Sequence, residues 1–195
     1  MILFSLTEMN RTHLNEVLMN DGRCLEHVRV QTEDLCLLAV SENGLALKFV
    51  LHKTYELCLV AVKQNGLALE FIKNQTKELC YIACEQNYNA FAFVNLKFQD
   101  EEFCLTIVRK NGLMLQHVVK QTVSICEEAL VNNPWALRFV KTQSVYLCFL
   151  ATIQNCLCFD LVIPELKDDV IQKITNSLES ENNLLVSLSP DICFS

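Results

Sequence analysis

Apolar residues recur along the chain in short blocks separated by polar turns, and the blocks themselves repeat. The string Asn-Gly-Leu-Ala-Leu at residues 43–47 returns at residues 65–69, an offset of 22 residues. Extending this offset aligns seven units, with two extra residues inserted in the fourth interval. A fixed period of this size is typical of helical repeat arrays, in which each unit buries its apolar face only against its neighbours. The equivalent anchor positions are Asp21, Asn43, Asn65, Asn87, Asn111, Asn133 and Asn155.

Each unit carries the signals of a helix of about ten residues followed by a shorter one. Gln31-Thr32 and its equivalents supply an N-cap residue, and acids follow in the first turn, where the helix dipole favours them. The Asn-Gly pair that ends this helix predicts a C-cap in the left-handed conformation. The second helix, for example residues 45–50, is expected to be α-helical or partly 3₁₀. The pattern therefore predicts an all-α fold, an α-solenoid of about seven 22-residue two-helix repeats with a C-terminal capping helix.

Three further columns of the repeat predict its core. A cysteine stands seven residues before the anchor in six units, and a small alanine, which permits close helix approach, stands four residues before it in five. Six residues after the anchor comes Phe, or His or Leu in its place, which we expect to be the large residue of the core. The cysteines are Cys36, Cys58, Cys80, Cys104, Cys126 and Cys148, the alanines Ala39, Ala61, Ala83, Ala129 and Ala151, and the phenylalanines Phe49, Phe71, Phe93 and Phe139.

The two ends of the chain depart from the repeat, as capping segments must. Leu3 and Leu6 fall in register with Leu25 and Val28, so residues 1–9 are predicted to be a partial N-terminal unit before the array of residues 10–163. Pro164 opens a segment whose apolar residues recur on one helical face, which predicts a capping helix at 164–178. Residues 179–195 lose the register and predict a tail of loops.

The pattern Gln-Asn-Gly-Leu-Ala-Leu-Glu-Phe at residues 64–71 resembles a repeat family of unknown function that is abundant in giant DNA viruses of amoebae, the mimivirus and marseillevirus relatives. The resemblance covers roughly residues 10–163. It is specific for the repeat type and brings no catalytic residue to transfer. It implies a viral protein that acts inside an infected host cell, in the host cytoplasm or the virus factory, or in the virion.

Composition narrows the function classes. The formal net charge of −7 argues against a surface that seeks phosphates throughout, and no apolar run approaches the length of a membrane span. The chain is therefore expected to be soluble and intracellular, with its eleven cysteines reduced. All four glycines belong to the repeat turn, which leaves no glycine loop to bind a nucleotide phosphate. We expect no cofactor.

No catalytic or metal-ligating residue is predicted. Equivalent cysteines lie a whole repeat apart, and Cys80 with Cys84 and Cys156 with Cys158 lack a second ligand pair at zinc-finger spacing. The Asn column could contact a partner's backbone, but a role in turns and caps is favoured. The best candidate binding feature is a basic row at the ends of the short helices, where cations also complement the helix dipole. The basic row comprises Arg29, Lys53, Lys73, Lys97, Lys120 and Lys141.

The leading functional hypothesis is a non-catalytic scaffold that binds another protein, of host or virus, along an extended surface. A nucleic-acid-binding helical repeat protein that uses the basic row is the alternative, which the acidic balance disfavours. Membrane association is not expected. The apolar N-terminus at Met1–Leu6 lacks a polar cap, which predicts a homodimer joined at that end unless these residues fold back onto the first unit.

Overall fold

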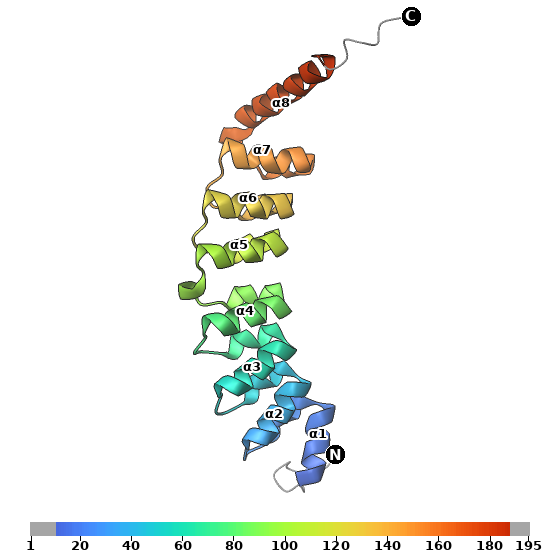
Figure 1. Cartoon of the computed structure of the whole chain (residues 1–195), viewed down its shortest axis with the longest axis vertical. Coiled ribbons are helices and arrows are strands. Elements are labelled where there is room, and N and C mark those ends of the chain that lie inside the picture. Colours follow the sequence, from blue (N-terminus) through green and yellow to red (C-terminus); the bar gives the residue numbers. More distant parts are fainter. Residues whose placement is uncertain (1–10, 188–195) are drawn as a thin grey trace, which may run out of the picture. The chain divides into compact units, whose positions relative to one another are not determined.

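A computed structural model of the chain describes residues 11–187. All regular structure in this range is helical, which confirms the predicted all-α repeat fold (Figure 1). The partial unit predicted at residues 1–9, and with it the dimer contact at Met1–Leu6, lies outside the described residues. Within residues 11–187 no helix is both long and apolar enough to cross a membrane.

Each repeat is a ten-residue α-helix followed by a six-residue 3₁₀ helix, which settles the character of the short second helix. The α-helices begin with α1 (Arg11–Asn20), and α2 to α7 span Glu33–Glu42, Tyr55–Gln64, Lys77–Gln86, Glu101–Lys110, Val123–Asn132 and Val145–Gln154. The 3₁₀ helices η2 to η5 span Gly22–His27, Gly44–Phe49, Gly66–Phe71 and Tyr88–Phe93, and η7 to η9 span Gly112–His117, Pro134–Phe139 and Cys156–Leu161. The inserted residues form an additional short helix, η6 (Leu96–Phe98).

The predicted N-caps of the α-helices are confirmed except at Thr32, whose side chain makes no capping hydrogen bond to α2. The Thr54 hydroxyl accepts a hydrogen bond from the Leu57 N–H at 3.3 Å, and the Asp100 carboxylate accepts one from Phe103 at 2.9 Å. Thr76 and Ser144 cap α4 and α7 in the same way. These caps satisfy N–H groups that have no partner within the helix, so each helix starts where the sequence predicts it.

The left-handed C-cap predicted for the Asn-Gly pair is wrong. Asn43 is extended, with φ −142° and ψ 104°, and its side chain caps the following 3₁₀ helix by accepting the Leu45 N–H at 3.1 Å. Its own N–H bonds the Ala39 carbonyl at the end of α2. The anchor residue therefore ends one helix and begins the next, and the anchors from Asn65 to Asn155 do the same.

The glycine of the turn is required by the next repeat. A Cβ on Gly66 would overlap the carbonyl oxygen of Ala83, and one on Gly44 would overlap that of Ala61. The Gly44 N–H also donates to the Gln64 Oε1 at 2.7 Å. Each 3₁₀ helix thus meets the α-helix of the following repeat at backbone distance, which confirms the close approach predicted from the alanine column.

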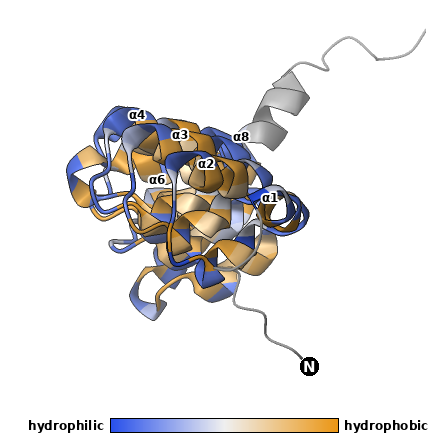
Figure 2. Cartoon of the chain, turned by 90° about the horizontal axis from the view of Figure 1, so that it is seen from below, coloured by the Kyte–Doolittle hydropathy of each residue, from blue (hydrophilic) through white to orange (hydrophobic). Residues whose placement is uncertain are grey.

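The core contains the predicted cysteine and alanine columns but not the phenylalanine column. All six column cysteines and all five column alanines are buried. In six of the seven six-residue 3₁₀ helices the large buried residue stands four residues after the anchor, as in Leu47, Leu69 and Phe91. Phe49 and Phe71 are only half-buried, and in η9 the residue four after the anchor, Phe159, is half-buried as well. The six-residue 3₁₀ helix turns the Phe position toward the rim. Figure 2 shows α2 and α3 as largely hydrophobic ribbons with hydrophilic residues at their ends.

The chain divides into two compact units after Phe103, within the repeat array predicted at residues 10–163. In the first unit α1 to α4 follow one another side by side (Figure 1), and in the second α6, α7 and α8 do so. The boundary falls inside α5, which follows the insertion. Tyr88 and Ile107 replace the Gly and Ala of the repeat on either side of this insertion.

The C-terminal helix is longer than predicted. After the short η10 (Pro164–Leu166), α8 runs from Lys167 to Ser187, so the loop tail predicted for residues 179–195 is wrong over its first part. Of the predicted apolar face, Val170 is fully buried and Leu178 is 56% exposed. The helix therefore covers α7 only with its first turns. Residues 188–195 lie outside the described range.

Candidate functional site

In four of the described repeats a glutamine amide joins the start of an α-helix to the end of the following 3₁₀ helix. In the first unit the Gln31 Nε2 donates to the Phe49 carbonyl at 2.9 Å, and its Oε1 accepts the Leu51 N–H at 2.9 Å. The Cys36 thiol donates to the same Oε1, with the sulfur 3.7 Å away. We call this arrangement the amide clamp. It gives one buried carbonyl and two donors their hydrogen-bond partners.

The amide clamp recurs at Gln75, Gln121 and Gln143. Gln75 bonds the Phe93 carbonyl at 2.8 Å and the Asn95 N–H at 2.9 Å, and the sulfur of Cys80 lies 3.5 Å from its Oε1. The two clamps in the second compact unit have the same partners at equivalent positions. The clamp explains why Gln precedes Thr in the repeat.

Lys53 occupies the clamp position in the third repeat, and the clamp is absent there. Its ammonium group donates to the Val50 carbonyl at 2.9 Å, at the end of the preceding 3₁₀ helix. In this repeat the groups equivalent to the clamp partners are the Phe71 carbonyl, the Lys73 N–H and the Cys58 thiol. Within the described part of the chain, none of them has a hydrogen bond like those that Gln31 and Gln75 provide.

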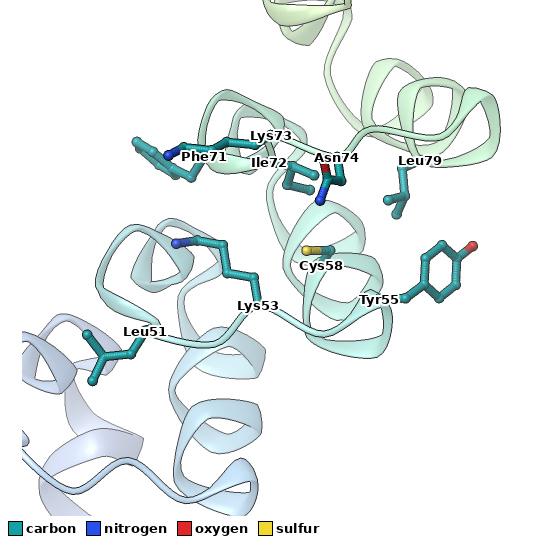
Figure 3. A pocket seen from close by; sticks show the side chains of 9 residues that line it. All are labelled: Leu51, Lys53, Tyr55, Cys58, Phe71, Ile72, Lys73, Asn74 and Leu79. Carbon is teal, nitrogen blue, oxygen red and sulfur yellow. The ribbon is translucent and has the colours of Figure 1, made fainter.

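The missing amide is accompanied by a larger cavity. A pocket of about 390 Å³ opens beside Lys53, lined by Cys58, Ile72 and Lys73 among others (Figure 3). One repeat earlier, where Gln31 is in place, the corresponding pocket measures about 240 Å³ and includes the acidic Glu33. The lining of the larger pocket contains two lysines and no acid. Its walls also include Leu51, Tyr55, Phe71, Asn74 and Leu79.

Burial raises the pKa of five thiols of the cysteine column, those of Cys36, Cys58, Cys80, Cys126 and Cys148. Burial raises the pKa of Cys80 to about 11 and that of its neighbour Cys84 to about 12. Burial also raises the pKa of the Cys58 thiol, and the positive charge of Lys53 partly offsets this rise. A thiol is a nucleophile only as the thiolate, so the environment of these side chains favours a packing role.

The basic row does not share one position in the repeat. Arg29, Lys73 and Lys141 stand eight residues after their anchors, Lys120 stands nine after and Lys53 ten, while Lys97 belongs to the inserted helix η6. The Lys141 ammonium group donates to the Val118 carbonyl at 3.2 Å and to that of Val119. Lys53 and Lys141 therefore donate hydrogen bonds to carbonyls near the ends of 3₁₀ helices. Such contacts fit the structural role of the row, in which cations complement the helix dipole.

Among the described residues no group of three or more His, Cys, Asp and Glu side chains is placed to hold a metal ion. His117 in the Phe column is half-buried, and burial lowers its pKa, whereas His27 in the same column is exposed. The Asn side chains use their oxygen for caps. The residues that the structure brings together are instead Lys53 and Lys73 of the basic row with Cys58 of the cysteine column, around the enlarged pocket (Figure 3).

The amide clamp and the pocket were both missed by the sequence analysis. The available signal was the recurrence of Gln ten residues after the anchor, counting the insertion, at residues 31, 75, 99, 121 and 143. Against that column, Lys53 is the exception. The basic row groups Lys53 with lysines that stand at other positions of the repeat, so it does not show that Lys53 replaces a glutamine.

A sequence model of a family described as Domain of unknown function (DUF4116) matches the chain twice, over residues 32–77 and 76–121. Each match spans two consecutive hairpins and begins near the N-cap of an α-helix. This match supports a repeat family of unknown function over the middle of the chain. No curated protein and no solved structure matches the sequence.

Proposed function

We propose that the chain is a non-catalytic scaffold that binds another protein along the exposed positions of its repeats. The observation that supports this best is a contrast within each α-helix. In five units the position four residues before the anchor is a buried Ala, whereas the position two residues before the anchor is exposed in all seven. We call the latter the outer column. It comprises Met19, Ser41, Lys63, Glu85, Arg109, Val131 and Ile153.

The outer column varies in chemistry while its backbone spacing stays fixed. In the first compact unit it changes from apolar Met19 through Ser41 to the opposite charges of Lys63 and Glu85. In the second unit Val131 and Ile153 are 61% and 53% exposed on the neighbouring helices α6 and α7. Packing cannot explain side chains that point into solvent, and a repeated frame with varied outer residues is how solenoid proteins form extended binding surfaces.

We propose that the chain is a viral protein that acts in the host cytoplasm, the virus factory or the virion. This proposal rests on the sequence resemblance alone. The partner is then a host or viral protein. No specific observation favours the nucleic-acid alternative, because the residues of the basic row do not occupy one repeat position.

Affinity capture from infected amoebae with the full chain tests the scaffold role. We expect one protein to be retained in stoichiometric amounts and to bind again when both proteins are purified. The double variant Val131→Lys, Ile153→Lys should lose this partner with little change in stability, whereas Ser41→Lys, at the same position in another repeat, is the matched control. Retention of every captured protein by the double variant would contradict a role for Val131 and Ile153. Failure of the purified pair to bind would contradict the scaffold role.

A further inference from the structure

The end of η4 has hydrogen-bond donors that lack an acceptor. In the four described clamps, one glutamine Oε1 receives both a backbone N–H and a cysteine S–H. At η4 the equivalent donors are the N–H of Lys73 and the thiol of Cys58, and no acceptor among the described residues contacts either. This pocket therefore lacks an oxygen atom at a position where four equivalent sites have one.

The charge around these donors favours an anionic oxygen. The side chains of Lys53 and Lys73 extend along the same side of the pocket (Figure 3), and no acidic residue lines it. The Lys53 ammonium group has three N–H donors and uses one of them on the Val50 carbonyl. A carboxylate accepts hydrogen bonds through two oxygens, and such bonds to charged donors are stronger than neutral ones.

Part of the pocket wall is apolar, and the pocket has the size of a small-ligand site. Ile72 and Leu79 are buried in its wall, and Leu51 is 66% exposed beside its opening. The volume of about 390 Å³ lies within the range of roughly 300–1,000 Å³ that is usual for small-molecule pockets. The corresponding pocket beside Gln31 is smaller, already contains the amide and includes Glu33, so the same ligand is excluded there.

We propose that this pocket binds a small carboxylate that carries a short apolar chain. One carboxylate oxygen takes the place of the glutamine Oε1 and accepts the Lys73 N–H. The ammonium groups of Lys53 and Lys73 balance the charge, and the apolar chain contacts Ile72 and Leu79. The site concerns a free small molecule and is independent of the protein-binding role proposed above.

Hexanoate is the probe that tests the site, with the ¹⁵N-labelled full chain observed by NMR. Titration into the millimolar range should shift the amide signal of Lys73 in a saturable manner and leave that of Lys141, which is bonded to Gln121 and does not line the pocket, nearly unchanged. Hexanamide has the same chain without the charge and should bind at least about tenfold more weakly, because its oxygen makes no charge-assisted hydrogen bond. A Lys73 signal that does not move with hexanoate, or equal binding of hexanamide, overturns the proposal.

Three variants connect the binding to this pocket. Lys53→Gln restores the glutamine of the other repeats and should abolish hexanoate binding, because the amide fills the acceptor position. Lys73→Gln keeps the backbone N–H but removes one charge, so binding should weaken and depend less on salt. Lys63→Gln removes a lysine of the same helix α3 that does not line the pocket and should bind as the wild type does. Hexanoate binding by Lys53→Gln or Lys73→Gln with wild-type affinity overturns the proposal.

Discussion

The end of η3 and the end of η4 lie one repeat apart and differ chiefly in the side chain that faces them. Gln31 bonds the Phe49 carbonyl and the Leu51 N–H at the first, whereas at the second Lys53 bonds the preceding 3₁₀ helix instead. The pocket grows from about 240 to about 390 Å³ between the two. Lys in place of Gln at this position thus removes the amide clamp of the repeat and is accompanied by a larger pocket.

This comparison separates two kinds of contact in the array. The contact between Gly and the alanine carbonyl of the next repeat is steric, and the first three repeats all retain it. The amide clamp is polar, and the fold persists where the clamp is missing. The close contact between the glycine and the alanine carbonyl of the next repeat therefore sets the spacing of the repeats. The clamp adds local stability, and the repeat that lacks the clamp has an open pocket instead.

The largest effect is expected from a side chain at the steric contact. Gly66→Ala places a methyl group against the carbonyl oxygen of Ala83, which is backbone and cannot rotate away, so unfolding should become easier by about 1–3 kcal/mol or more. Urea denaturation measures the change. Glu85→Ala, an exposed position of α4, is the control and should lie within about 0.5 kcal/mol of the wild type. Equal stability of Gly66→Ala and the control would refute the steric contact.

Loss of a clamp should cost more than loss of the lysine that replaces it. Gln75→Leu removes two part-buried hydrogen bonds at once, those to the Phe93 carbonyl and the Asn95 N–H, which should destabilise the fold by about 2 kcal/mol. Lys53→Leu removes a single, part-buried hydrogen bond and should cost less than about 1 kcal/mol. Equal losses in urea denaturation would show that the clamp contributes nothing particular.

The two thiols beside these positions should also differ. Burial raises the pKa of both thiols, that of Cys80 to about 11, and a lysine partly offsets each rise, Lys97 at Cys80 and Lys53 at Cys58. The two differ in access, because Cys80 is fully buried and bonded to Gln75, whereas Cys58 lines the open pocket. Iodoacetamide should therefore alkylate Cys58 of the native protein faster than Cys80, as peptide mass analysis would show. Alkylation of both at one rate would mean that the pocket does not admit small molecules.

The raised thiol pKa values also predict a loss of stability in alkali. The folded chain holds the Cys80 proton more tightly than the unfolded chain does, so the unfolded chain binds fewer protons as the pH rises above the ordinary thiol value of 9.0. The contribution of this thiol should be present below that pH and be lost between about pH 9 and pH 11. Urea midpoints at pH 8 and pH 10, with Cys80→Ala losing less than the wild type, check the sign.

The smallest expected effect is an increase in the free energy of unfolding. Lys53→Gln should form a fifth described clamp with the Phe71 carbonyl and the Lys73 N–H and stabilise the fold by about 1 kcal/mol. The same change elsewhere in the repeat, Lys63→Gln at an exposed position of α3, should leave the urea midpoint unchanged. A lower midpoint for Lys53→Gln would show that Lys53 is itself the better partner for this site.

The sequence predicted those features that depend on neighbours along the chain. The period, the α-helix bounds and the caps at Thr54 and Asp100 all follow from local patterns, and the structure confirms them. The reason for Gly66 could not be predicted in this way, because the atom it avoids belongs to Ala83 in the next repeat. An Asn-Gly pair suits a left-handed C-cap and an extended N-cap equally, and the packing of the following helix decides between them.

The candidate site was only partly predictable for the same reason. The sequence placed Lys53 and Lys73 in a basic row and Cys58 in a core column, but it did not show that one pocket joins them. That pocket depends on what Gln31 does one repeat earlier, a contact over 18 residues to Phe49 that periodicity alone does not reveal. The division after Phe103 had a visible signal in the insertion and in Tyr88, where the repeat has Gly.

Hydrogen exchange of two backbone amides in one wild-type sample tests the central comparison most directly. The Leu51 N–H is bonded to the Gln31 Oε1 at 2.9 Å, while the equivalent Lys73 N–H has no acceptor among the described residues. The account predicts that Leu51 exchanges at least about tenfold more slowly than Lys73 after correction for intrinsic rates, and that Lys53→Gln slows Lys73 to match. Equal protection of the two amides in the wild type, or no change at Lys73 in the variant, would contradict it.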